Sequence, residues 1–164
     1  MKKRIEWMAL FTCIALVFLV ALAGSFFTSQ NSGSQWYNSI KPSITPPNFV
    51  FPIVWNILFL LIALSLYFAW TSIKKNKTKK SKSSRDSIAL FFGINLFLNL
   101  LWSFLFFAMK LPAFAFFELI ILWISILALI FVTYKIRKLS AYLLIPYALW
   151  IAFAGVLNYL IAFA

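Results

Sequence analysis

Histidine is absent from this 164-residue sequence, and cysteine occurs once, at Cys13. The chain therefore lacks the clusters of nitrogen and sulfur ligands that hold zinc or ligate haem iron, so neither a protein-bound metal nor a required cofactor is expected. One cysteine also excludes a disulfide within the chain. Acidic residues number three against 15 lysines and arginines. The sequence offers neither an acid–base pair nor an activated nucleophile, so no catalytic residue is assigned.

Apolar residues are what the sequence has in excess. They make up 64% of the chain and charged residues 11%, whereas soluble domains average about 45–50% and about 25%. A bilayer rather than water is therefore the expected solvent. The net charge of +12 does not indicate a nucleic-acid partner, because the basic residues occupy short stretches between apolar runs instead of one folded polar surface.

Five apolar stretches are long enough to cross a bilayer. We expect transmembrane helices at about residues 7–27, 49–73, 87–109, 113–134 and 140–163, since a hydrocarbon core about 30 Å thick needs about 20 residues. The first stretch is longer than the apolar region of a signal peptide and is expected to be retained. The sequence predicts an all-α integral membrane bundle in a single domain, 1–164.

Basic residues predict the orientation of this bundle. Thirteen of the 15 lysines and arginines lie in the N-terminal tail, in the segment 74–86 and in the segment 135–138, whereas the alternate loops hold Lys41 and Lys110. Because positively charged loops stay in the cytoplasm, the N-terminus is predicted to be cytoplasmic and the C-terminus extracytoplasmic. The segment 74–86 consists mainly of lysine and serine and is expected to be a solvated linker.

The first loop, about residues 28–48, contains aromatic residues followed by three prolines. Prolines fix the backbone and discourage helix at the residue before them. A stiff loop that ends where a helix starts can act as a lid over a ligand site, and the alternative is a simple turn with interfacial aromatics. The lid residues would be Trp36, Pro42, Pro46 and Pro47.

Three of the expected helices carry stripes of aromatic and polar side chains at steps of three and four residues, which places each stripe on one helix face. Such stripes suit a flat apolar ligand, because rings stack on a conjugated plane and asparagine can donate and accept hydrogen bonds at its rim. The alternative is that the asparagines bond between helices and the rings fill the bundle. The residues are Trp55 and Phe59; Asn95, Asn99, Trp102 and Phe106; and Tyr147, Trp150, Ala154 and Asn158.

Other tryptophans and the fourth helix's acid have simpler expected roles. Trp7, Trp36, Trp70 and Trp123 are assigned to the interfacial aromatic belts. Glu118 lies near the start of its helix, where an acid is expected to reach the interface or to pair with a base such as Lys110. A role for Glu118 in proton coupling is the alternative.

The motifs taken in order resemble those of the TspO/MBR family, the translocator proteins and tryptophan-rich sensory proteins. The resemblance spans nearly the whole chain, and no single motif carries it. Its parts are Trp36-Tyr37, Lys41-Pro42 and Pro46-Pro47; Phe51-Pro52, Val54-Trp55 and Phe59; Asn95, Asn99, Trp102-Ser103 and Phe106-Phe107; and Leu144-Ile145-Pro146-Tyr147, Trp150, Phe153-Ala154 and Leu157-Asn158.

The resemblance implies a bundle of five helices, usually a homodimer, in a prokaryotic cytoplasmic membrane, with a pocket open to the extracytoplasmic side and covered by the first loop. Family members bind porphyrins such as protoporphyrin IX and haem, so a receptor or carrier for tetrapyrroles is expected. By positional match the pocket is lined by Tyr37, Trp55, Phe59, Asn99, Trp102, Trp150 and Ala154, with Asn95, Tyr147 and Asn158 nearby.

Two other functions stay open. One is light- and oxygen-dependent porphyrin degradation, reported for some family members, in which Trp55 and Trp150 would be redox partners of the photoexcited porphyrin. The other is proton-coupled transport through Glu118. Sterol binding is put in doubt, because the cholesterol pattern of animal members needs a basic residue shortly after a tyrosine. Tyr159 is followed by none.

Overall fold

The computed structural model describes residues 5–73 and 79–163, with the backbone alone for residues 79–81. Secondary structure in this part of the chain is helical throughout. Five helical stretches are long and apolar enough to cross a membrane, which confirms the predicted fold class. The chain is a multi-pass membrane protein. The spans are Trp7–Asn31, Val50–Ser72, Lys82–Ala108, Pro112–Tyr134 and Lys138–Phe163.

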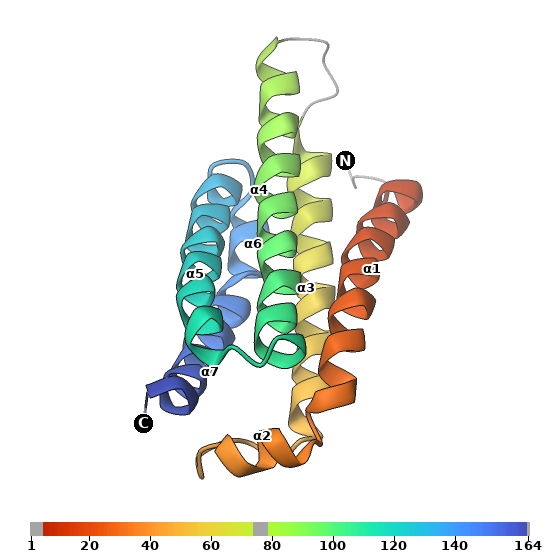
Figure 1. Ribbon diagram of the computed structural model, residues 1–164. Coiled ribbons are helices and arrows are strands. Elements are labelled where there is room, and N and C mark those ends of the chain that lie inside the picture. The colour runs from red at the N-terminus through yellow and green to blue at the C-terminus, as the bar shows by residue number, and fades with distance from the viewer. Residues whose placement is uncertain (1–4, 74–78, 164) are drawn as a thin grey trace.

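The long helices run up and down beside one another, and one short helix lies across an end of the bundle (Figure 1). That short helix, α2, belongs to the predicted first loop. Helix α1 starts at the opposite end, and α7 finishes at the same end as α2 (Figure 1). The elements are α1 (Trp7–Asn31), α2 (Gln35–Ile40), α3 (Val50–Ser72), α4 (Lys79–Ser103), the π-helix η1 (Phe104–Ala108), α5 (Pro112–Tyr134), α6 (Lys138–Tyr142) and α7 (Ile145–Phe163).

Polar residues prolong α1 by one turn beyond the predicted end at 27. The Thr28 hydroxyl donates to the Gly24 carbonyl at 3.0 Å, and the Asn31 amide to the Phe27 carbonyl at 3.4 Å. These side chains find partners on their own helix, so the helix continues into the region predicted as loop. Helix α2 then starts at Ser34, whose hydroxyl accepts the Tyr37 N–H at 3.2 Å as an N-cap.

The prediction of a linker at 74–86 is wrong for residues 79–86, because these residues form the first turns of α4. Residues 74–78 lie outside the described part of the chain. The stretch 79–86 contains neither proline nor glycine, and lysine and arginine are good helix formers, so a helix can extend beyond the apolar run. Arg85 ties this turn to α3, with its guanidinium 5.5 Å from the Trp70 ring centre and 3.4 Å from the Ile73 carbonyl oxygen.

Two predicted continuous helices are interrupted. The last one, expected at 140–163, begins at Lys138 and breaks between α6 and α7 at residues 143–144. Pro146 explains the break, because it has no N–H to donate and its ring clashes with the carbonyl four residues earlier. The third predicted helix, expected at 87–109, changes from the α-helix α4 to the π-helix η1 at Phe104. A π-helix widens the turn, and such segments occur frequently at functional sites.

Helix α5 packs against α4, α6 and α7, and α1 packs against α3 and α4. Close packing and interhelical hydrogen bonds hold such a bundle, because lipid tails are as apolar as the side chains. The clearest bond of this kind joins α3 to α6: the Ser65 hydroxyl donates to the Ser140 carbonyl at 2.9 Å, and the Ser140 hydroxyl donates to the Ser65 carbonyl at 2.5 Å. Both serines are fully buried. These two hydrogen bonds therefore hold α6, the part of the last span before its break, against α3.

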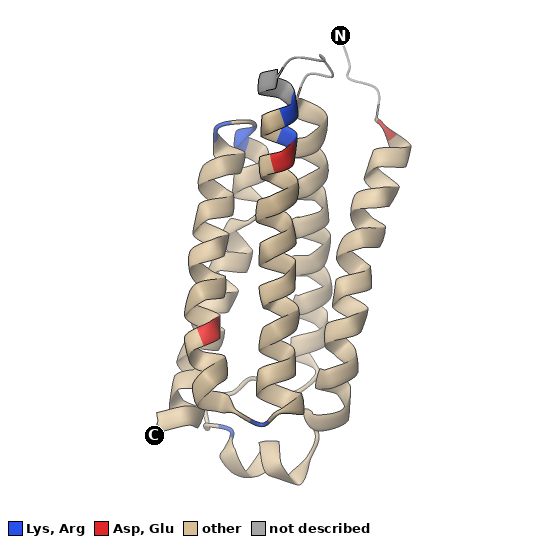
Figure 2. Ribbon diagram, turned by 45° about the horizontal axis from the view of Figure 1, so that its top comes forward, with Lys and Arg blue, Asp and Glu red and all other residues tan. Residues whose placement is uncertain are grey.

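Charged side chains gather at one end of the bundle. In Figure 2 most of the blue lies at the end where α1 starts, which is where α4 begins and α5 meets α6. The opposite end, with α2 and the η1–α5 turn, carries Lys41 and Lys110. The folded chain therefore keeps the charge asymmetry on which the predicted orientation depends.

Candidate ligand site

Residues from α3, α4 and α7 meet in what we call the inner cluster: Trp55, Phe59, Asn99 and Tyr147. The Asn99 amide nitrogen and the Tyr147 hydroxyl share a buried hydrogen bond of 3.0 Å, with the amide as donor. The Trp55 ring stacks on Phe59, with centroids 5.3 Å apart, and meets the Tyr147 ring edge-on at 6.4 Å. The structure thus brings the three predicted stripes together. Ligand binding by these residues stays a prediction.

Asn158 joins three helices. Its carbonyl oxygen accepts the Trp102 indole N–H at 3.0 Å, and its amide donates to the Pro112 carbonyl at 2.8 Å. The side chain is 1% exposed. It therefore holds α7 to α4 and α5, and part of its hydrogen-bonding capacity serves the bundle itself, as one alternative from the sequence anticipated.

Asn95 connects α4 to α5. Its amide donates to the Ser125 hydroxyl at 2.8 Å, and that hydroxyl donates to the Leu122 carbonyl at 2.6 Å. The Asn95 carbonyl oxygen is buried and has no hydrogen-bond partner among the described residues. Ser125 was not predicted as a site residue, because its contact depends on the pairing of α4 with α5.

A second group of rings, which we call the lid cluster, packs α2 against the end of α4: Trp36, Tyr37, Trp102, Phe106 and Phe107. Trp102 stacks on Phe106 at 5.1 Å, and Trp36 meets Phe106 at 5.9 Å. Tyr37 lies 6.2 Å and 5.8 Å from the two phenylalanine rings and is buried. Burial raises the pKa of the Tyr37 hydroxyl, so the group stays protonated at neutral pH.

The lid cluster contains two residues that the predicted site left out. Phe106 follows Trp102 by four residues, so its stripe was visible in the sequence. Phe107 lies off that stripe and was noted only within the Phe106-Phe107 motif of the family resemblance; it is buried beside Phe106 through the widened turn of η1. Of the predicted lid residues, Trp36 contacts the cluster, whereas the prolines form the turns that lead to α3. Backbone hydrogen bonds close those turns: the Thr45 N–H donates to the Pro42 carbonyl at 3.0 Å, and the Val50 N–H donates to the Pro47 carbonyl at 2.9 Å.

Trp150 and Ala154 line the same side of α7 as the inner cluster and pack, partly buried, against the core. Trp150 contacts Phe51 at 5.9 Å and Phe153 at 5.7 Å. Trp55 and Trp150, which the sequence proposed as redox partners of a porphyrin, thus each have ring neighbours of their own. Their part in any photochemistry stays a prediction.

Glu118 contradicts its expected position. It is 6% exposed, and both carboxyl oxygens are buried without a hydrogen-bond partner among the described residues. It comes six positions after Pro112, the first residue of α5, so it lies roughly 9 Å along the helix, at about 1.5 Å per residue. Lys110 does not neutralise it, because the Lys110 ammonium lies 5.7 Å from the Trp36 ring centre. The expectation of an interfacial or paired acid is therefore wrong.

Two of the four tryptophans assigned to the interfacial belts have other positions. Trp7 is 70% exposed at the start of α1, and Trp70 lies at the end of α3, and their place in the belts stays a prediction. Trp36 belongs to the lid cluster. Trp123 lies in the middle of α5 and donates its indole N–H to the Ala148 carbonyl at 3.0 Å. The belt assignment of Trp123 is therefore wrong, because the partner of its N–H is a carbonyl of α7.

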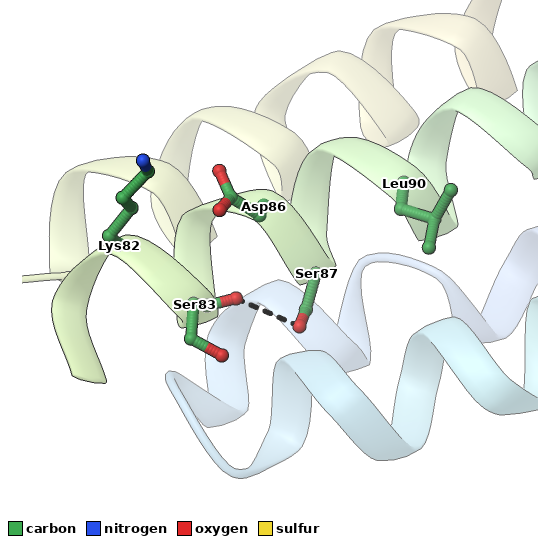
Figure 3. A pocket seen from close by; sticks show the side chains of 5 residues that line it. All are labelled: Lys82, Ser83, Asp86, Ser87 and Leu90. Atoms are coloured by element: carbon green, nitrogen blue, oxygen red, sulfur yellow. Dashed lines mark hydrogen bonds between the residues drawn. The ribbon is translucent and has the colours of Figure 1, made fainter. Parts of the chain in front are cut away.

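A surface hollow of about 370 Å³ lies near the other end of α4 (Figure 3). Figure 3 shows its lining as four polar side chains and Leu90 along one helix, with the Ser87 hydroxyl bonded to the Ser83 carbonyl at 2.9 Å. No aromatic side chain lines it. The hollow therefore offers no stacking surface for a flat ligand and is distinct from the inner and lid clusters. Its lining residues are Lys82, Ser83, Asp86, Ser87 and Leu90.

Known proteins resemble this chain over nearly its full length. The TspO/MBR family model matches residues 13–164. The chain is 36% identical over 162 residues to the tryptophan-rich protein TspO of Chlorobaculum tepidum, covering 98% of this chain and 97% of the relative. It is 39% identical over 149 residues to that of Archaeoglobus fulgidus (90% and 91%) and 32% identical over 145 residues to the translocator protein of Sus scrofa (86% and 83%).

Proposed function

Because this chain belongs to the TspO/MBR family of membrane proteins, we propose that it is a receptor or carrier that binds tetrapyrroles and similar flat apolar ligands. The observation that carries the proposal is the convergence of three helices on the inner cluster, where Trp55 and Phe59 lie beside the bond between Asn99 and Tyr147. A stacking surface and a polar rim therefore occur together inside an apolar bundle, which is the combination that a planar ligand with polar edges needs.

Binding would use ring stacking and hydrogen bonding. The stacks of Trp55 on Phe59 and of Trp102 on Phe106 hold indole faces that a conjugated macrocycle can cover. Each such aromatic contact is worth about 0.5–1.5 kcal/mol beyond the buried area. Asn99 and Tyr147 can offer donors and acceptors to the ligand's edge by exchanging their mutual bond for bonds to it.

The proposal includes an orientation. The end of the bundle that carries α2 and the lid cluster has two basic residues in its loops, and the other end has the remaining basic loops. Positively charged loops are retained in the cytoplasm. We therefore place the lid cluster on the extracytoplasmic side, where a ligand would enter, and the N-terminus in the cytoplasm.

Titration with protoporphyrin IX tests the proposal. Tryptophan fluorescence of the purified protein in detergent is expected to fall saturably as the porphyrin binds. Replacing Trp55 and Trp150 together with leucine removes two rings, and at about 0.5–1.5 kcal/mol for each ring the affinity should fall roughly tenfold or more. The measured quantity is the dissociation constant obtained from fluorescence quenching.

A matched double variant separates binding from the loss of fluorophores. Trp7 and Trp70 lie at the other end of the bundle. Replacing both with leucine should reduce the fluorescence but leave the dissociation constant within about twofold, since neither ring belongs to the inner cluster or the lid cluster. Quenching that does not saturate, or equal affinity of the two double variants, would refute the proposed site.

The proposal also includes a homodimer, which the family resemblance implies. On the outer face of α4, Ala89 and Gly93 are exposed, and nothing lies within 4 Å of a Cβ placed on Gly93. Small residues of this kind allow a second helix to approach closely in a membrane. Light scattering of the detergent-solubilised protein, with the detergent mass subtracted, is expected to give the mass of two chains; the mass of one chain would contradict the homodimer.

Burial of Glu118 favours a second candidate function, proton-coupled transport. An unpaired acid inside a membrane bundle is costly, and such acids usually mark ion or proton pathways. Glu118 lies on α5, which packs against α7, the helix that carries Tyr147 of the inner cluster. This second candidate therefore places the proton-exchanging acid on a helix that adjoins the inner cluster.

A further inference from the structure

Lys110 holds a backbone conformation that disfavours lysine. Its φ is 54°, the one positive value among the non-glycine residues that the structure describes. It follows the end of η1 in a turn closed by the Met109 N–H on the Phe104 carbonyl at 2.9 Å and the Leu111 N–H on the Leu105 carbonyl at 3.0 Å. Glycine usually occupies this place after a helix, because a Cβ is strained there. The position therefore keeps a lysine side chain at an energetic cost.

The Lys110 side chain extends to the lid cluster. Its ammonium lies 5.7 Å from the centre of the Trp36 ring, within range of a cation–π contact. Trp36 in turn meets Phe106, on which Trp102 stacks. The positive charge thus lies at the rim of the same rings that offer stacking surface to a flat ligand.

Lys41 supplies a second charge, at the C-terminal end of α2, the short helix that carries Trp36. It caps the C-terminus of α2, with its N–H bonded to the Tyr37 carbonyl at 3.0 Å, and its ammonium donates to the Asn38 side-chain oxygen at 2.8 Å. Lys41 comes four positions after Tyr37 and directly follows the helix that carries Trp36 and Tyr37, and both Lys41 and Lys110 are exposed. This end of the bundle therefore presents two exposed ammonium groups, one in contact with Trp36 and one at the end of the helix that carries it.

None of the three acidic side chains, all of which lie in the described part of the chain, is placed to balance this pair. The sequence has three acidic residues. Glu6 precedes α1 and Asp86 lies in the first turns of α4, both at the opposite end of the bundle, and Glu118 is buried with neither oxygen bonded among the described residues. Charges that meet a low-dielectric surface without a counter-ion attract anions from solution. The lid cluster therefore has a positively charged edge.

We propose that Lys110 and Lys41 form an anion-binding edge of the lid cluster that takes the carboxylate groups of an acidic, flat ligand. The inference rests on the proposed function and adds a preference to it: ring stacking alone would accept neutral and acidic macrocycles alike, whereas the two ammonium groups select the acids. Carboxylates beside ammonium groups form charge-assisted hydrogen bonds, which are stronger than neutral ones.

Comparing protoporphyrin IX with its dimethyl ester tests this edge. The two compounds share the macrocycle and differ in their carboxylates. The wild-type protein is expected to bind the acid at least tenfold more tightly than the ester, and the variant with Lys41→Gln and Lys110→Gln should lose that preference while it binds the ester as before. The preference should also shrink with rising salt, because exposed charges are screened.

Two further variants keep the result interpretable. Lys110→Gly relieves the strained φ, so it should melt no lower than wild type and yet weaken acid binding without changing ester binding. Lys82→Gln and Lys138→Gln, at the other end of the bundle, should leave both affinities unchanged. An unchanged acid-to-ester ratio in the Lys41 and Lys110 variants would overturn the anion-binding edge while leaving the proposed function intact. No saturable binding of either compound to the wild type would refute both.

Discussion

Replacing Asn158 with leucine is expected to lower the free energy of unfolding in detergent by about 2 kcal/mol. The substitution leaves one buried donor and one buried acceptor without a partner, and each such group costs about 1–3 kcal/mol before the surrounding structure relaxes. Those groups are the Trp102 indole N–H and the Pro112 carbonyl. Bonds between membrane helices often contribute less than this, but Asn158 makes two of them on two different helices. Denaturant unfolding followed by circular dichroism measures the change.

Asn56→Leu is the matched control. Asn56 is exposed on α3, and its amide donates to Pro52 of the same helix at 2.8 Å. Its replacement should change the free energy of unfolding by less than about 0.5 kcal/mol, as surface substitutions usually do. If the two variants unfold alike, Asn158 does not hold the three helices together.

Replacing Glu118 with glutamine is expected to abolish the dependence of porphyrin uptake on a proton gradient in liposomes, since an amide cannot release a proton. The same change should not destabilise the protein and should raise its melting temperature, because removing a charge that lacks a partner in an apolar interior relieves a cost of several kcal/mol for the ionised form. Uptake with and without an imposed pH gradient, together with thermal melts, measures both effects.

Asp86→Asn is the control for the Glu118 variant. Asp86 is an exposed acid in the first turns of α4, away from Glu118. Its replacement with asparagine should therefore alter neither gradient-dependent uptake nor the melting temperature. Gradient-dependent uptake that survives in the Glu118 variant would exclude this acid as the coupling group. A lower melting temperature would show instead that the carboxyl has a structural partner.

The five spans followed from the sequence because the requirement is local. A hydrocarbon core demands a fixed length of apolar residues whatever the neighbouring helices are. The ends of the spans were less predictable. Residues 79–86 are polar, and their composition resembles that of a linker, yet nothing in them breaks a helix. The interruption of the last span could have been read from Pro146, whose effect on the preceding turn is general.

The candidate site, too, could be predicted from the sequence only in part. Spacing put Asn99, Trp102 and Phe106 on one face of the predicted third helix, because helical geometry fixes which residues share a face. It could not say which partner each polar group would take. Asn95 and Asn99 are one turn apart and of the same type, yet one bonds to Ser125 of α5 and the other to Tyr147 of α7. Contacts between distant segments decide such pairings.

Composition, apolar length and the placement of charges by themselves determined that this chain is a membrane bundle with five spans and aromatic stripes on three of them. Only the tertiary structure decided that those stripes meet, that α2 packs on η1, and that Glu118 is buried with no hydrogen-bond partner among the residues described. The physical reason is that transfer into lipid is a property of each segment, whereas the partner of a polar group inside the bundle depends on which helices lie beside it.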